Sequence, residues 1–294
     1  MKRTVFRNRW LPYLLVAPQV AITLVFFYWP AFDSVRLSLY RASPFGDRLI
    51  FVGWGNFARL FGDASYVRSA VTSVLFAFIV TVVGLALALV LAALANAKIR
   101  GLAIYRSLLL WPYGIAPAIA GILWLFIFHP SYGVLPYVLS FVTAYQFNWF
   151  LKGWVAMTLI IVAAIWKQFG YNLAFYLAGL QGIEASVLEA ASVDGAGPVR
   201  RFLAITFPLL SPVTFFLFTL NMTFAFFETF GLVHSVTQGG PGDATSLLVY
   251  KAWKDGFENL QLGFSAAQSV VLMAVVIGLT ALQFRFAEKK VTYS

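Results

Sequence analysis

The sequence has 294 residues, of which 61% are hydrophobic and 11% are charged, and its mean hydropathy is +0.83. These values exclude an ordinary water-soluble domain and indicate an integral membrane protein. The net charge of +10 does not indicate a nucleic-acid-binding protein, because the basic residues lie in short clusters beside apolar runs. The chain has no cysteine and two distant histidines, His129 and His234, so neither a disulfide framework nor a metal centre is expected.

Apolar runs long enough to cross a bilayer recur along the whole chain. A membrane-spanning helix needs about 20 apolar residues, and about six such runs occur. They cover residues 11–29, 70–95, 105–128, 155–177, 207–230 and 264–284. The first run follows basic residues as a signal peptide does, but it is too long and lacks a small-residue cleavage site, so we expect a retained span. The predicted fold is all-α, a polytopic membrane helix bundle of about six transmembrane helices in a single domain over residues 1–294, with core spans over about 70–284.

The positive charges predict the orientation of these spans. With six spans, both termini lie on one side, and that side collects 12 basic residues in short segments, against 8 spread over longer loops on the other. The 12 are Lys2, Arg3, Arg7, Arg9, Lys98, Arg100, Arg106, Arg200, Arg201, Arg285, Lys289 and Lys290. Because basic residues in short segments stay in the cytoplasm, both termini and the loop over residues 183–208 are expected there.

The loop over residues 183–208 is unusually polar for this chain and has the signals of two short helices. Ser186 with Glu189 fits a capping box, and Gly195 suits the left-handed residue after a helix end. Pro198 suits the first turn of a second helix, and Pro208 then starts the next span. The expected apolar face of the second helix consists of Val199, Phe202, Leu203 and Thr206. Such an elbow could dock another protein, or it could be a plain connector; the spacing alone leaves both possible.

A family resemblance favours docking. Glu189-Ala190-Ala191, followed after three residues by Gly195, after nine more by Ile205 and then by Phe207-Pro208, resembles the EAA motif of ATP-binding-cassette importer permeases. Phe207 takes the place of the usual Leu, a conservative exchange. The resemblance implies that the elbow is a coupling helix that fits a cleft on an ATPase subunit. The docking residues that it implies are Glu189, Ala190, Ala191, Asp194, Gly195, Ile205 and Pro208.

Further stretches extend the resemblance over nearly the whole chain. They are RWLPYLLVAPQ, LLLWPYGIAPAIAGILWLFIF, IWKQFGYNLAFYLAGLQ, TQGGPGDATSLLVYKAWKDGF and SAAQSVVLM. They are similar to the binding-protein-dependent carbohydrate-uptake permeases, above all those of bacterial sn-glycerol-3-phosphate importers, with the type I importer permease fold. The implied cargo is sn-glycerol 3-phosphate or a glycerophosphodiester, with a disaccharide or another sugar as the alternative.

The same resemblance implies the partners and the location. It implies a second, homologous permease that completes a heterodimer, two copies of an ATPase subunit, a periplasmic or extracellular substrate-binding protein, and the bacterial inner membrane. The sequence has no G-x-x-x-x-G-K-[ST] segment, so it cannot hold a nucleotide in the P-loop manner. We therefore expect no enzymatic activity and no cofactor in this chain, with ATP and Mg²⁺ bound by the partner ATPase.

Ionisable residues within the spans are candidates for the substrate path, because charge inside a membrane is costly. Lys167 lies near the middle of the fourth span, and Glu228 lies toward the outer end of the fifth. Lys167 could bind a phosphate dianion, or it could snorkel or pair with a helix carbonyl or with an acid of the partner. The neighbouring polar candidates are Gln168, Tyr171, Asn172 and Asn221. Their amide and phenol groups suit hydroxyl recognition, but they equally suit hydrogen bonds between helices.

Two prolines predict a break in the third span. Pro112 and Pro117 flank Gly114, and proline both removes a helix hydrogen bond and clashes with the preceding turn. Broken helices often line transport cavities.

Two other classes of protein fit less well. A secondary transporter would need inverted repeats and membrane acids, but no repeat is evident and Glu228 is the one candidate acid. A membrane enzyme would need a cluster of catalytic side chains, which two isolated histidines do not supply.

Overall fold

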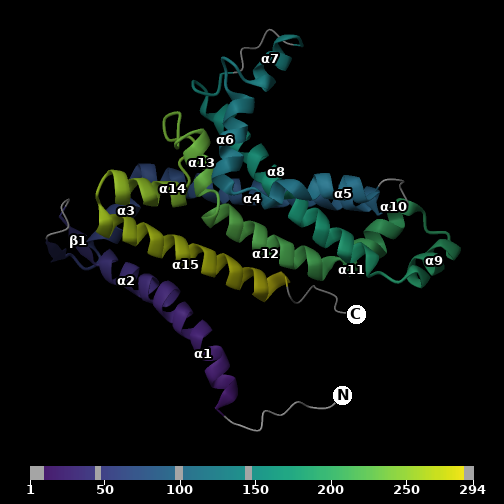
Figure 1. Ribbon diagram of the computed structural model, residues 1–294, viewed down its shortest axis with the longest axis horizontal. Coiled ribbons are helices and arrows are strands. Elements are labelled where there is room, and N and C mark those ends of the chain that lie inside the picture. Colours follow the sequence, from purple (N-terminus) through teal and green to yellow (C-terminus); the bar gives the residue numbers. More distant parts are fainter. Residues whose placement is uncertain (1–9, 44–47, 97–101, 143–147, 288–294) are drawn as a thin grey trace. The chain divides into compact units, whose positions relative to one another are not determined.

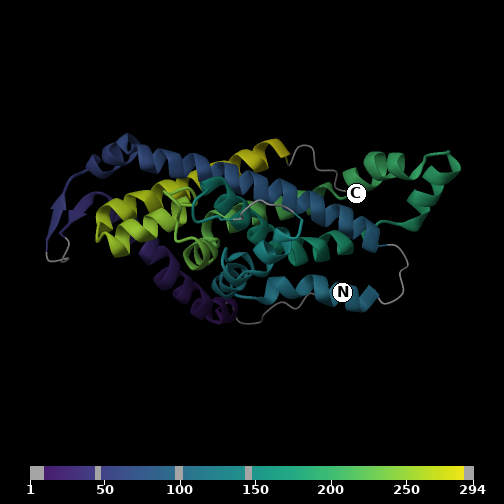
Figure 2. The same ribbon diagram turned by 90° about the horizontal axis from the view of Figure 1, so that it is seen from above.

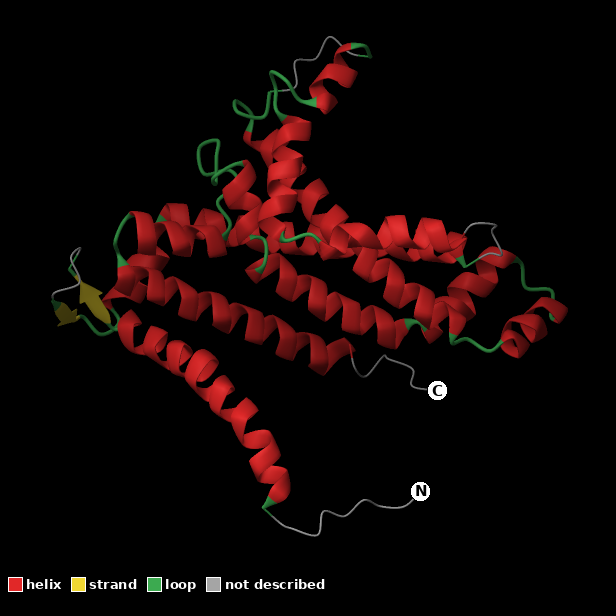
Figure 3. Cartoon of the chain, viewed as in Figure 1, coloured by secondary structure: helices red, strands yellow, loops and turns green. Residues whose placement is uncertain are grey.

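The computed structural model describes residues 10–43, 48–96, 102–142 and 148–287. The described chain is mostly helical, with one pair of short strands (Figure 3). It divides into two compact units, Met1–Gly62 with Ala252–Val271, and Asp63–Lys251 with Leu272–Ser294. The expectation of one domain over the whole chain stays a prediction.

The first unit contains the N-terminal span. Its α1 (Leu11–Thr23), η1 (Leu24–Tyr28) and α2 (Trp29–Ser38) form one apolar helical run from Leu11 to Ser38, and none of its apolar window is buried within the chain. The run therefore continues well beyond residue 29, where the sequence predicted its end. Pro30 does not stop it, because the π turn η1 comes directly before it: the Trp29 N–H donates to the Leu24 carbonyl five residues back, and this local widening of the helix accommodates the proline.

A pair of short strands and a short helix follow this span. Strands β1 (Tyr40–Ala42) and β2 (Leu49–Phe51) pair antiparallel, with Tyr40 opposite Phe51, and α3 (Gly55–Gly62) follows. The buried Asn56 amide donates to the carbonyls of Ser38 (2.8 Å) and Tyr40 (2.9 Å). It thereby satisfies backbone acceptors at the end of α2 that have no helical partner.

The C-terminal part of the first unit contains η4 (Lys254–Glu258) and the beginning of α15 (Leu262–Ala287). Three polar side chains of this part form a small hydrogen-bonded cluster. The buried Asp255 carboxylate accepts hydrogen bonds from the amides of Gln268 (2.6 Å) and Asn259 (2.9 Å). These bonds compensate the cost of burying the carboxylate.

Three helices form the core of the second unit: α4 (Ala64–Ala95), α8 (Gly153–Gln181) and α12 (Ser211–Phe227). Figures 1 and 2 both show α4 and α8 running side by side. Asp63 caps α4 by accepting from the Ser65 N–H (2.8 Å). Their shared buried cluster consists of Leu85, Ala88, Leu89, Ala92, Leu173, Tyr176, Leu177, Leu180, Leu210 and Leu217. Small residues such as Ala88 and Ala92 let the helices approach closely, which is how helices associate in lipid.

The third span is broken, as the prolines predicted. Helix α5 (Leu102–Leu110) passes through the 3-10 turn η2 (Trp111–Gly114) into α6 (Pro117–Phe128), and the axis changes direction by 110°. Beyond the break, α6 lies beside α13 (Phe230–Val236), and α7 (Val134–Ser140) follows it (Figure 1). Gly121 permits this contact, because a Cβ there would lie 2.8 Å from the Cβ of Ser235.

The remaining helices complete the second unit. They are α9 (Ala185–Val193), α10 (Pro198–Arg201), η3 (Phe202–Thr206), α11 (Phe207–Leu209) and α14 (Leu248–Trp253), of which α14 ends in the first unit. The described chain has four straight helices able to cross a membrane, and up to six spans if each of two bent pairs is one. The fifth predicted span is not straight: it bends by 66° between Leu209 and Ser211, and α12 ends at Phe227 rather than at residue 230.

Candidate functional site

The elbow over residues 183–208 is a helix, a tight turn and a second helix, as predicted. Figure 1 shows α9 and α10 at one end of the long helices α4 and α8. The predicted capping box is wrong, because the N-cap residue is Glu184 and Ser186 already lies inside α9. The Ser186 hydroxyl instead donates to the Glu184 carboxylate (3.2 Å).

Gly195 has the left-handed conformation that the sequence predicted, with φ of +78°. The Gly195 N–H donates to the Ser192 carbonyl (3.1 Å), and the Ala196 N–H reaches back to the Ala191 carbonyl (3.0 Å). This pair of bonds is the Schellman arrangement, in which a glycine turns the chain and satisfies the last helix carbonyls. The spacing from Glu189-Ala190-Ala191 to Gly195 therefore encodes the end of α9 and the direction in which the chain leaves it.

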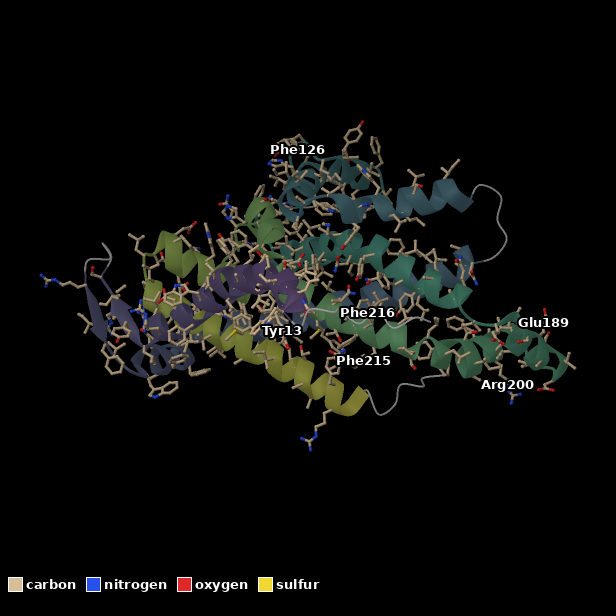
Figure 4. All side chains as sticks on the ribbon, turned by 60° about the horizontal axis from the view of Figure 1, so that its bottom comes forward. Tyr13, Phe126, Glu189, Arg200, Phe215 and Phe216 are labelled. Atoms are coloured by element: carbon tan, nitrogen blue, oxygen red, sulfur yellow. The ribbon has the colours of Figure 1, made fainter. Side chains whose placement is uncertain are left out.

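The elbow presents a mixed polar and apolar surface. Glu189, Ala190 and Asp194 are exposed, whereas Ala191 is buried, and Figure 4 shows Glu189 and Arg200 at opposite edges of the elbow. Three of its apolar residues are largely exposed: Val193 is 88% exposed, Val199 70% and Leu203 61%. Because the elbow also carries exposed charged residues, these apolar side chains are candidates for contact with a partner.

The predicted apolar face of the second helix is divided between two environments. Thr206 is buried and Phe202 is half-buried, whereas Val199 and Leu203 are exposed. Ile205 is half-buried and Pro208 is exposed, so the seven predicted docking residues differ in exposure. Their role in docking stays a prediction. Val193 is one of the exposed apolar residues of the elbow, and the sequence analysis missed it. The available signal was its position two residues after Ala191, which places it on another face of α9.

The base of the elbow is held against the bundle at the bend before α12. Pro208 lies in α11 on the near side of this bend, so it does not start the span as predicted; α12 starts at Ser211. The bend packs closely against α8 at Gly179, where a Cβ would lie 2.8 Å from the Cδ2 of Leu210. Beside it is a hollow of ≈ 280 Å³ lined by Ala93, Asn96, Leu180, Ile183, Leu188, Pro198, Arg201, Phe202 and Thr206.

The mid-span lysine is buried and binds the broken third span. The side chain of Lys167 is 6% exposed, and its Nζ donates to the Tyr113 carbonyl at 2.7 Å. The same Nζ lies 5.2 Å from the centroid of the Tyr113 ring, and this ring lies 4.9 Å from that of Tyr171. Of the alternatives open at the sequence level, Lys167 thus has a carbonyl partner. Glu228 lies exposed at the C-cap of α12.

Two of the other candidates for the substrate path are hydrogen-bonded to each other inside the helix bundle. Asn172 of α8 and Asn221 of α12 are fully buried, and their amides exchange two hydrogen bonds of 3.0 Å and 2.7 Å. The Asn221 amide also donates to the Leu217 carbonyl (2.8 Å). Their geometry gives these residues a role in joining two helices. Gln168 is buried on α8, and Tyr171 is half-buried.

Tyr113 is the functional candidate that the sequence analysis missed. Its contribution to Lys167 is a backbone carbonyl, which no side-chain pattern reveals, and the available signal was its place between Pro112 and Gly114. A carbonyl in a proline-induced break lacks its helical donor and so can accept from a side chain.

Bent and broken spans around a close-packed core, with a helical elbow at one end, define a multi-pass membrane protein. The fold is similar to a chain of the bacterial transporter involved in the import of the acidic polysaccharide alginate (TM-score 0.82, 19% identity, 95% of this chain and 96% of that chain). It is also similar to a chain of the bacterial alginate transporter in complex with an alginate pentasaccharide-bound periplasmic protein (TM-score 0.83, 18% identity, 97% and 96%).

Residues 104–293 match the family described as binding-protein-dependent transport system inner membrane component, and the chain belongs to this family. The sn-glycerol-3-phosphate transport system permease protein UgpA of Rhizobium meliloti (strain 1021) is 53% identical, with 100% of both chains covered. UgpA of Agrobacterium fabrum is 51% identical over 100% of both chains, and UgpA of Escherichia coli O157:H7 is 48% identical over 99% of this chain and 98% of that one. The predictions of a multi-pass all-α fold and of an importer permease are confirmed.

Proposed function

We propose that this chain forms half of the translocation path of an ATP-driven importer for sn-glycerol 3-phosphate or its glycerophosphodiesters. The observation that carries the proposal is the identity of about half of all residues, over the full chain, to permeases named for sn-glycerol-3-phosphate transport. The mid-span ammonium of Lys167 agrees with an anionic cargo, because it can form charge-assisted hydrogen bonds to phosphate oxygens.

The proposed assembly has four kinds of subunit. A second, homologous permease completes the path, two copies of an ATPase subunit bind and hydrolyse ATP with Mg²⁺, and a substrate-binding protein delivers the cargo from outside. The family description supports the binding protein, since it names a binding-protein-dependent system. In this arrangement the chain itself performs no hydrolysis and carries no cofactor.

The elbow is the proposed contact with the ATPase. Glu189, Ala190, Asp194 and the turn at Gly195 would enter the ATPase cleft together with the exposed Val193. Ala191 and Ile205 would serve from the inner side, by fixing the elbow to the bundle, and Pro208 would serve by starting α11 at the bend before α12. Closure of the ATPase dimer on ATP would move the elbow as a rigid lever, and the spans would turn the path outward, as alternating access requires.

This function places the elbow and both termini in the cytoplasm of a cell with the protein in its inner membrane. Support comes from Arg200 and Arg201, which lie on α10, because short basic loops are retained inside. Arg285, another of the predicted cytoplasmic charges, is exposed in the last turn of α15. The remaining ones lie outside the described residues, as does the side chain of Arg106; they are Lys2, Arg3, Arg7, Arg9, Lys98, Arg100, Lys289 and Lys290.

Uptake by cells tests the proposal. In a strain that lacks this chain but keeps its partner genes, uptake of radiolabelled sn-glycerol 3-phosphate should be lost and should return when the chain is supplied. The same cells given radiolabelled maltose should show no dependence on the chain. If sugar uptake and not glycerol phosphate uptake followed the chain, the carbohydrate alternative would replace this proposal.

A further inference from the structure

Lys167 is a buried cation with too few partners. An ammonium group has three N–H donors, and within the described residues its one hydrogen-bond acceptor is the Tyr113 carbonyl. No carboxylate of the described chain lies within salt-bridge distance of Nζ. A buried charge is costly unless it is paired and fully hydrogen-bonded, so the site as it stands is favourable for a further anionic acceptor.

The hydrogen bond from Lys167 to the Tyr113 carbonyl joins α8 to the break in the third span. Tyr113 lies in η2, the turn in which the third span changes direction by 110° between α5 and α6. One turn along α8 from Lys167, Gly170 packs so closely that a Cβ would lie 2.5 Å from the Leu109 carbonyl. The break therefore packs closely on α8 at Gly170, and one turn earlier it is tied to α8 by the Lys167 hydrogen bond.

The charge of a ligand determines how strongly the ammonium attracts it. Because the Coulomb energy is proportional to the product of the two charges, a doubly charged anion gains more from Lys167 than a singly charged one. A phosphate monoester carries close to two negative charges at neutral pH and three acceptor oxygens, which exceeds what one carbonyl oxygen offers.

We propose that Lys167 is the seat of the cargo's phosphate within the membrane and that the Tyr113 carbonyl is the resting acceptor that the phosphate displaces. When the phosphate takes the ammonium, η2 loses its polar tie to α8, and the angle between α5 and α6 is free to change. Lys167 is then both a specificity residue for phosphate and the latch of the broken span. This inference rests on the proposed function, since it takes the phosphate cargo from it.

Variants of the reconstituted complex test the seat. The permeases, ATPase and binding protein are placed together in proteoliposomes, and uptake of sn-glycerol 3-phosphate and ATP hydrolysis are both measured. Lys167→Met, of similar length but without donors, should reduce uptake by about tenfold or more, while ATP hydrolysis without substrate should not fall. Lys167→Arg should keep more uptake than Lys167→Met. The matched control is Lys152→Met, which removes the same charge at the N-terminal end of α8 and should leave both activities unchanged.

A distance measurement tests the latch. The chain has no cysteine, so Leu108→Cys on α5 and Phe126→Cys on α6, both exposed, can carry two spin labels. Without ATP, the distance between the labels should shift when the binding protein is added with sn-glycerol 3-phosphate, and not when it is added empty. With Lys167→Met in the same chain, the shift should be absent.

The outcomes separate this inference from the proposed function. If the unaltered complex does not import sn-glycerol 3-phosphate, the proposed function fails. If it does, and Lys167→Met imports as fast with the same coupling to ATP, the phosphate seat is overturned. If Lys167→Met does not assemble, the label distance in the otherwise unaltered chain decides, because an unchanged distance with loaded binding protein overturns the latch.

Discussion

Replacing Gly195 by alanine tests whether the turn of the elbow determines coupling. Gly195 has φ of +78°, and a Cβ there would meet nothing within 4 Å, so alanine adds conformational strain without a clash. A non-glycine residue in the left-handed region costs about 1–2 kcal/mol. That cost opposes the two hydrogen bonds by which Gly195 and Ala196 end α9. The population with an intact turn, relative to the opened one, should therefore fall by a factor of about 5–30.

The chain supplies its own matched control two residues further on. Gly197 also has open space around its Cβ position, but its φ of −63° suits alanine. Hydrogen exchange of the elbow amides should accelerate in Gly195→Ala and not in Gly197→Ala, and the amount of ATPase that copurifies with the chain should follow the same order. Membrane insertion should be equal in both. Equal copurification of the ATPase with both variants would refute the view that this turn sets the docking geometry.

Two further substitutions test the packing that positions the site. Asn221→Leu should lower the melting temperature in detergent, because it leaves the buried Asn172 amide without its partner at a cost of about 0.6–2 kcal/mol. Adding Asn172→Leu to this variant should cost little more stability. Strictly additive losses of stability from the two substitutions would argue against the pair. Gly170→Ala should push α5 away from α8 and reduce both stability and uptake, whereas Gly278→Ala, which has open space, should be neutral or slightly stabilising. Equal effects of the two alanines would contradict the close contact.

The sequence predicts those parts of the site that depend on the backbone preferences of single residues, above all proline and glycine. Pro112 and Pro117 predict the break in the third span, because the missing hydrogen bond and the steric clash are properties of proline itself. Gly195 likewise predicts the turn of the elbow, since few other residues adopt its conformation. The prediction of a capping box was wrong because Ser186 and Glu189 fit the sequence pattern equally well two residues after the true N-cap, Glu184.

Contacts between distant segments lie beyond such rules. The pairing of Asn172 with Asn221 joins two spans across 49 positions, and a periodic pattern does not show which polar residues of two helices meet. The acceptor of Lys167 is a backbone oxygen 54 positions away, released by the break, so no residue type marks it. The bend of 66° before α12 was missed for a related reason: the apolar run continues through it, and hydropathy records composition rather than direction.

Cysteine accessibility at the elbow tests the central claim most directly. Because the chain has no cysteine, Ala190→Cys provides a single thiol at an exposed position of α9. A membrane-impermeant maleimide should leave it unlabelled in intact cells, label it in inside-out vesicles that lack the ATPase subunit, and label it much less when the ATPase is bound. Asn259→Cys, exposed in an expected outer loop, should show the reverse in intact cells. Labelling of Ala190→Cys in intact cells, or no protection by the ATPase, would contradict the account of an importer permease driven through this elbow.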